Sequence, residues 1–427
     1  MKIRTKAALA AALGLAVPAT ATGQASGPKA TYWVSAETTS GMAAGGMGGM
    51  MQGMGGQPGY PPGYTPPSVG GAVGSAAGSA VGSALGGYAG SVVGGALGGL
   101  LGRGRGKKQA QAPAAPAAQA PAPARTNFVR SLRLELGSSQ RPNGAPSAEH
   151  LIPAGLNMGP SLPLVTPQAT PTTPSTGSYG MADGQRPKGR MMIYWGCGEK
   201  AAAAPIVIDF ATLSAGKAPN LPVVNVATGT VPTAGKWATL GLWPNERSNV
   251  KQVPTNGSLV GQHTVRGNYS PEIRFALGAG QDFMAPLTIT SKDRSPGGGT
   301  RLVWTAVPGA TGYFAQVMGA REDQTMVMWT SSATAASFSA LMDYVPPSEV
   351  RRLIASRHVL PPSTTQCIVP AEVVQAAPTA MLMMVAYGDE VNAADPPRPA
   401  KGPWHVNWTT KVRFKSTTTA MLGVPGT

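Results

Sequence analysis

Side chains that usually carry catalysis are few and scattered in this sequence of 427 residues. The four histidines lie in unrelated contexts, and no pair of them has the spacing of metal ligands. The sequence has no Gly-x-Ser-x-Gly motif, no phosphate-binding loop that ends in Lys-Ser or Lys-Thr, and no dinucleotide fingerprint. We therefore expect a protein that is not an enzyme and needs no cofactor. The histidines are His150, His263, His358 and His405.

Two cysteines, Cys197 and Cys367, are the only thiols of the chain. In an oxidising compartment they could form a disulfide, but their spacing does not tell whether they meet. Two small buried thiols are the alternative. Cys197 lies between two glycines, so a reactive thiol is a third and weaker interpretation.

Five methionines between residues 42 and 54 include two successive Met-x-x-Met pairs. Thioether sulfur is a soft ligand that suits Cu(I) or Ag(I) where thiolates are unreliable. One alternative function is therefore periplasmic soft-metal binding through this Met-rich segment. The other interpretation of these residues is adaptable apolar filler near a membrane. The ligands of such a site would be Met47, Met50, Met51 and Met54.

Nine glycines recur at a strict spacing of four residues within residues 70–102. A period of four places them on one gently winding stripe of an α-helix. Each glycine costs a water-exposed helix about 1 kcal/mol relative to Ala, whereas helices in lipid use such small residues to pack closely. We therefore expect helix packing through this stripe, which consists of Gly70, Gly74, Gly78, Gly82, Gly86, Gly90, Gly94, Gly98 and Gly102.

No charged residue lies between Glu37 and Arg103, and a basic cluster suited to lipid headgroups follows the stripe. The segment resembles the glycine zippers of bacterial cell-envelope proteins, which implies attachment to membrane lipid and self-association. A disordered Gly/Ala/Ser tether is the alternative. The flanking basic residues are Arg103, Arg105, Lys107 and Lys108.

Residues 70–102 would reach roughly 50 Å as one helix, well beyond a hydrocarbon core of about 30 Å. A steeply tilted single span and a hairpin broken at Gly86-Gly87 are both open, and we favour the hairpin. A hairpin keeps its two ends on one side, so residues 31–38 could return to the first β domain as an edge strand.

The first 25 residues have the order of a signal peptide: a basic start, an apolar run over residues 7–17, and small residues after it. We therefore expect export to a Gram-negative cell envelope, in the outer membrane or periplasm rather than the inner membrane. The formal net charge of +16 favours anionic partners such as lipopolysaccharide or an anionic envelope glycan. No sequence motif supports nucleic acid as a partner.

The remaining chain divides by composition. Residues 26–69 hold one short strand and low-complexity sequence, and residues 103–126 form a basic, Pro/Ala-rich linker. Short strands separated by Gly, Pro and Asn follow, which is typical of antiparallel β-sandwiches. We expect a mainly β protein with two immunoglobulin-like β-sandwich domains, at 127–280 and 281–427.

Residues 302–313 read Leu-Val-Trp-Thr-Ala-Val-Pro-Gly-Ala-Thr-Gly-Tyr. They resemble the first strands of fibronectin type III and related immunoglobulin-like domains, in which a Trp and a Tyr on successive strands face each other across the core. The resemblance implies such a contact between Trp304 and Tyr313. A capped helix is expected from Pro346-Pro347 onward, closing one end of the sandwich.

Taken together, these patterns predict a membrane-associated envelope protein with a structural, adhesive or scaffolding role, which self-associates through the glycine stripe. A secreted glycan-binding or enzymatic protein is the alternative from another class.

Overall fold

The computed structural model describes residues 27–42, 44, 128–167, 189–210, 212, 223–244, 252–321, 323–335, 337–338 and 341–423. The glycine stripe, its basic flank and Met47, Met50, Met51 and Met54 lie outside these residues, as does the expected signal peptide.

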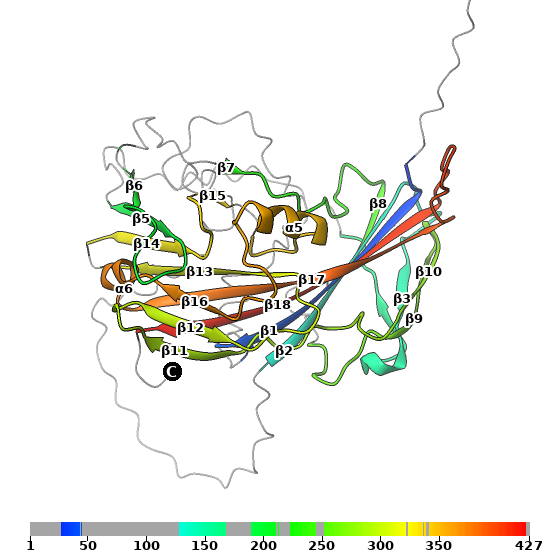
Figure 1. The fold of residues 1–427 in the computed structure, drawn as a ribbon. Helices are drawn as coiled ribbons and strands as arrows, with labels where there is room; N and C mark the ends of the chain where they lie inside the picture. Colours follow the sequence, from blue (N-terminus) through cyan, green and yellow to red (C-terminus); the bar gives the residue numbers. More distant parts are fainter. Residues whose placement is uncertain are drawn as a thin grey trace, which may run out of the picture.

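The described chain is mainly β and is organised around one nine-stranded sheet (Figure 1). In spatial order the strands are β6 (Ile206–Asp209), β5 (Arg190–Trp195), β14 (Thr325–Thr330), β13 (Gly312–Ala320), β17 (Ala380–Asp395), β18 (Trp408–Leu422), β1 (Ala30–Gly41), β2 (Phe128–Ser138) and β8 (Thr239–Trp243).

Two smaller sheets cover one face of this large sheet, which we call the core face. The first has the order β10 (Ser270–Leu277), β9 (Gly261–Gly267), β3 (Ala148–Leu151) and β4 (Ser161–Pro163). The second has the order β11 (Ile289–Arg294), β12 (Thr300–Trp304) and β16 (Gln366–Val369), with helix α6 (Ala371–Ala376) and the short helix η1 (Ala154–Leu156) completing this side. One continuous hydrophobic cluster fills the space between the layers.

The opposite face, which we call the outer face, carries helix α5 (Pro347–Ala355). This helix packs Val350 and Leu353 against Phe314 and Val385 of the sheet. The short parallel pair β7 (Val223–Val224) and β15 (Ser337–Phe338) lies outside the large sheet. Alternation along each strand divides its side chains between the two faces.

Strand β1 corrects the expectation of an edge strand. It lies inside the sheet, parallel to β18 and antiparallel to β2, so both of its edges are paired (Figure 1). The physical reason is that both faces of β1 are buried: Tyr32, Val34 and Ala36 are fully buried on the core face, and Trp33 is 7% exposed on the outer face.

The large sheet also crosses the domain boundary expected at residue 280. Strands β2, β5, β6 and β8 precede that boundary, and β13, β14, β17 and β18 follow it, yet they share one sheet. The join is direct because β5 pairs with β14 in parallel. The hydrophobic cluster likewise runs from Ala30 to Leu422. Two separate sandwiches are therefore not seen in the described residues.

Several local features agree with the sequence. Trp304 on β12 and Tyr313 on β13 are buried, and their ring centroids lie 5.6 Å apart in an edge-on contact across the core. Helix α5 begins at Pro347, as the Pro-Pro-Ser-Glu sequence predicts.

Candidate functional site at the root of the insert

The chain between β1 and β2, residues 42–127, is an insert that joins two strands whose adjoining ends lie side by side. Ser40 at the end of β1 is the register partner of Phe128 at the start of β2. We call Ser40, Gly41 and Phe128 the root of the insert. The predicted glycine-rich membrane segment thus departs from and returns to adjacent strands of one sheet.

Gly41 sets the direction in which the chain leaves the sheet. Its φ is +72°, a left-handed conformation that glycine adopts without strain. A Cβ atom built on Gly41 would lie 2.2 Å from the carbonyl oxygen of Thr419 on β18. That same oxygen accepts the amide N–H of Met42 at 3.1 Å. Only glycine therefore fits at this exit.

Hydroxyl groups bind the last residues of β1 to the chain between β10 and β11. Thr38 Oγ1 donates to the carbonyl of Met284 at 2.7 Å, and Ser40 Oγ donates to the carbonyl of Leu287 at 2.5 Å. Both hydroxyl residues are buried. The end of β1 is consequently held from two directions, by strand pairing and by side chains.

The first residues of β2 are held by Arg130. Its guanidinium lies 5.7 Å from the ring centroid of Phe128 and 5.1 Å from that of Phe283. Its Nη1 donates to the carbonyl of Gly257 at 2.5 Å. Cation–π contacts of this kind stabilise a partly buried guanidinium. Both strands that carry the insert are thus anchored in the body.

The beginning of β1 is attached to the small sheet of β3 and β9 by a buried hydrogen-bond chain. Tyr32 Oη lies 2.9 Å from Nδ1 of His150, and Nε2 of His150 lies 2.9 Å from Nδ1 of His263. Nε2 of His263 lies 2.7 Å from the carbonyl oxygen of Leu259. All three side chains are essentially inaccessible to solvent.

The carbonyl of Leu259 fixes the proton positions in this chain, because a carbonyl only accepts. His263 therefore carries its proton on Nε2, so its Nδ1 accepts from Nε2–H of His150, and Nδ1 of His150 accepts from the Tyr32 hydroxyl. Burial lowers the pKa of His150 well below its usual value, and the charge of His263 lowers it further. Burial also lowers the pKa of His263. Both rings are therefore neutral in the folded protein near pH 7.

Sequence reasoning treated these two histidines as unrelated, and the structure brings them together through the pairing of β3 with β9. A signal existed in the local pattern. Each histidine occupies an inward position of an alternating strand, in Ala-Glu-His-Leu and in Gly-Gln-His-Thr-Val. Buried histidines need partners, so two such positions could have suggested one network.

The outer face of β1 carries a cation–aromatic cluster. The Arg413 guanidinium lies 4.9 Å from the ring centroid of Trp33 and 4.4 Å from that of Tyr344, and its Nε donates to Ser35 Oγ at 2.7 Å. Lys415 Nζ lies 3.5 Å from a carboxylate oxygen of Glu37. Burial raises the pKa of Tyr344 well above its usual range. Because Arg413 is only 9% exposed, we interpret this cluster as a contact between strands and not as a binding surface.

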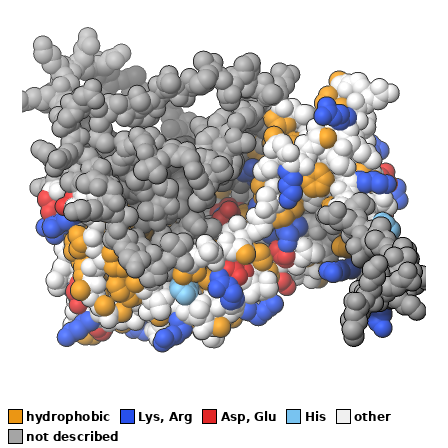
Figure 2. All heavy atoms as spheres, turned by 90° about the horizontal axis from the view of Figure 1, so that it is seen from above, with side chains coloured by type: hydrophobic (Ala, Val, Ile, Leu, Met, Phe, Trp, Pro, Cys, Tyr) orange, Lys and Arg blue, Asp and Glu red, His pale blue; other side chains and the backbone are white. Residues whose placement is uncertain are grey.

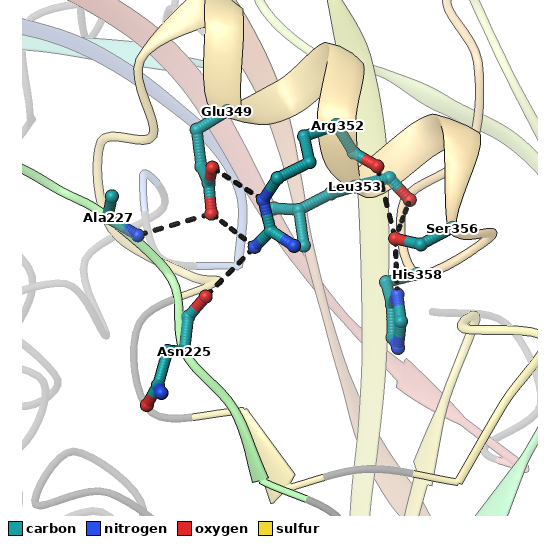
Figure 3. Close-up of polar contacts among 7 residues, drawn as sticks. All are labelled: Asn225, Ala227, Glu349, Arg352, Leu353, Ser356 and His358. Carbon is teal, nitrogen blue, oxygen red and sulfur yellow. Dashed lines mark hydrogen bonds and ion pairs between the residues drawn. The ribbon is translucent and has the colours of Figure 1, made fainter.

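Helix α5 contacts the loop at Asn225 and Ala227 through polar side chains (Figure 3). Both carboxylate oxygens of Glu349 accept from the Arg352 guanidinium, and Oε1 of Glu349 also accepts the amide N–H of Ala227 at 3.2 Å. Arg352 in turn donates to the carbonyl of Asn225 at 2.9 Å. Gly229, two residues after Ala227, lies against the Trp33 ring. A hollow of about 10 Å³ between Tyr344 and Arg413 has room for at most one water molecule.

Cys197 and Cys367 form a disulfide, with their Cα atoms 5.2 Å apart. This outcome selects one of the three alternatives that the sequence left open. The bond joins the loop after β5 to β16, and so ties the large sheet to a small one.

Within the described part of the chain, no three His, Cys, Asp or Glu side chains gather in a way that could hold a metal ion. No helix among the described residues is long and apolar enough to span a membrane. Comparisons of the chain with models of protein families, with curated proteins and with solved structures found no match.

Proposed function

We propose that this chain is a non-enzymatic, structural or scaffolding component of a bacterial cell envelope. In this proposal the glycine-rich segment at residues 70–102 attaches the molecule to a membrane and to other copies of itself, while the β body stays on one side. Anionic envelope glycan or lipopolysaccharide would be the partners of the basic body.

The observation that carries the proposal is the geometry of the root. Strands β1 and β2 pair along their whole length, from Ala30 with Ser138 to Ser40 with Phe128. A single membrane crossing between them would place the two strands on opposite sides of the bilayer, where they could not pair. The root therefore favours an insert that enters and leaves on one side, as a helical hairpin does.

The lengths agree with a hairpin that breaks at Gly86-Gly87. Each arm would have about 16 residues and reach about 24 Å, slightly less than a hydrocarbon core of about 30 Å. Glycine along the stripe lets the arms of one or several copies approach closely. The basic residues Arg103 to Lys108 would then lie at the headgroups.

The position of β1 agrees with removal of the predicted signal peptide. This strand begins at Ala30, directly after the predicted signal peptide of 25 residues, and it is needed inside the sheet. The body is therefore incomplete without the mature amino terminus. The disulfide between Cys197 and Cys367 supports an oxidising compartment.

The Lys and Arg side chains would attract the proposed anionic partners through the net positive charge of the chain. On the visible part of the face in Figure 2 they are spread among hydrophobic and acidic side chains and do not form one patch. This distribution favours weak contact over a broad surface, whose strength falls as salt is added.

The stripe can be tested with a matched pair of full-length variants expressed in their native membrane. G78L/G82L/G86L/G90L fills the stripe with side chains, and A72L/A76L/A80L/A84L adds the same four side chains about 200° around the helix. We expect the first variant to lose the oligomers seen by cross-linking in mild detergent, and the second to keep them. Oligomers that survive in both variants would refute self-association through the stripe.

A further inference from the structure

Four methionines from four neighbouring strands stand side by side across the large sheet. Met328 on β14 is the register partner of Met318 on β13. Met318 is also the partner of Met381 on β17, which is in turn the partner of Met421 on β18. Register partners project from the same face, with Cβ atoms about 4.5–5.5 Å apart. We call these four residues the methionine row.

Three more methionines border the row on the same face. Met326 lies two residues before Met328, Met383 lies two residues after Met381, and Met191 on β5 is the register partner of Met326. Met191 and Met383 are buried, whereas Met326 and all four members of the row are partly exposed. The side chains of Met326 and Met328 pack against a small buried cluster that contains Met191.

The methionine row belongs to the outer face. The residues that alternate with it, Val317, Val327 and Leu382, are buried at 1% exposure or less in the main cluster on the core face. Further along the same outer face, Phe314 and Val385 are covered by α5. The methionine row therefore lies on the same face as the residues that α5 covers, four residues away along β13 and β17.

The chemistry of the row differs from that of an ordinary half-buried strand surface. Val, Ile and aromatic residues are the residues usually found at half-buried strand positions, and the four positions of the methionine row carry Met instead. Thioether sulfur is neutral, polarisable and soft, and it selects Cu(I) over hard cations. Methionine also has three rotatable bonds, so neighbouring sulfurs can converge on one point.

We propose that the methionine row binds a soft monovalent ion, Cu(I) or Ag(I), through the sulfurs of Met318, Met328 and Met381. Met318 is the centre of this set of three because Met328 and Met381 are its register partners on its two sides. Met326 and Met383 border this set, two residues along their strands from Met328 and Met381. The site uses none of the predicted ligands between residues 47 and 54, and it does not depend on the proposed membrane attachment.

The selectivity of the site follows from its ligands. Strand neighbours of Met318 on this face include Gln316 and Ala320, which carry no charge. Three neutral thioethers give a hard divalent ion such as Zn²⁺ no carboxylate, imidazole or thiolate. The expected ligand is therefore a monovalent, soft ion that tolerates a partly dehydrated site.

The test uses the full chain with M42L/M47L/M50L/M51L/M54L as background, so that the amino-terminal methionines contribute no sulfur. Into this background M318L/M328L/M381L is introduced, and M158L/M192L/M284L serves as the control. Met192 is a suitable control residue because it pairs with Val327 and so lies on the other face of β5. Leucine preserves approximate volume and apolar character while removing the sulfur. Circular dichroism establishes that each variant is folded.

Two measurements are made on each protein: competition for Cu(I) with a chromophoric chelator, and methyl NMR of ¹³Cε-labelled methionine during titration with Ag(I). We expect micromolar or tighter affinity in the background and control proteins, and at least tenfold weaker affinity in M318L/M328L/M381L. The methyl signals of Met318, Met328 and Met381 should shift together at one equivalent, and Zn²⁺ should shift none of them. Equal affinity in all three proteins, or an affinity weaker than micromolar in the background protein, would overturn the proposal.

Discussion

The buried Tyr32–His150–His263 chain makes the stability of the body depend on pH in a direction that the structure fixes. Burial lowers the pKa of both histidines in the folded protein. In the unfolded chain each returns to a pKa of about 6.5. Below that pH the unfolded chain binds more protons than the folded one, so stability is lost as the pH falls and is fully present above it.

The magnitude follows from the number of protons. One histidine that stays neutral in the folded state lowers the free energy of unfolding by about 1.4 kcal/mol for each pH unit below 6.5. Between pH 7.5 and 5.5, His150 alone would contribute a loss of about 1.4 kcal/mol, and both histidines up to about 2.7 kcal/mol. Such a loss is large beside the 5–15 kcal/mol that typically holds a folded protein together.

The assay is urea unfolding of the full chain in mild detergent, followed by tryptophan fluorescence at pH 7.5, 6.5 and 5.5. H150Q/H263Q keeps donors and acceptors in place but cannot titrate, so it should be less stable at pH 7.5 and lose less stability on acidification. L382V weakens the same core elsewhere and should keep the wild-type pH dependence. If wild type and H150Q/H263Q lose the same stability between pH 7.5 and 5.5, the reasoning about the buried pair is refuted.

Three further substitutions test other parts of the account. Y32F leaves Nδ1 of His150 without its donor and should cost about 1–3 kcal/mol in thermal or urea unfolding, and a change near zero would contradict the buried hydrogen bond. G41A should cost at least about 2 kcal/mol because of its left-handed φ and the Thr419 carbonyl, whereas G144A, also at positive φ but with open space around it, should cost about 1 kcal/mol; equal losses would remove the special role of Gly41. C197S/C367S should lower the free energy of unfolding by up to about 5 kcal/mol, because the disulfide closes a loop of 170 residues, and unchanged urea midpoints would show that the bond does not constrain the unfolded chain.

The sequence predicted the local elements better than their assembly. Alternation in residues 31–38 is a property of neighbouring residues, and this segment is a strand. The start of α5 at Pro347 is equally local, although no side chain caps it with a hydrogen bond. Which strands pair with one another is not a local property, because β1 pairs with β18, which lies at the other end of the chain. Nothing in the spacing of residues indicates that pairing.

The candidate site shows the same division. The nine glycines and the Met-x-x-Met pairs are visible because they repeat within short windows of the sequence. The histidine pair and the methionine row are assembled from strands that are distant in sequence, and they become visible only once the register is known. The exit at Gly41 likewise depends on its neighbour Thr419 from the other end of the chain.

The most direct test of the central claim is to cut the insert on one side and then on both. A protease site is placed in the Pro/Ala linker between residues 109 and 125, and a second in residues 55–69, in the full chain embedded in its membrane. After the first cut alone, the body should stay with the membrane, because β1 remains paired with β2 and β18 and is still joined to the glycine-rich segment. After both cuts, the body should be released with β1 still bound to it. Release after the first cut would contradict the pairing at the root, and retention after both cuts would contradict attachment through the insert.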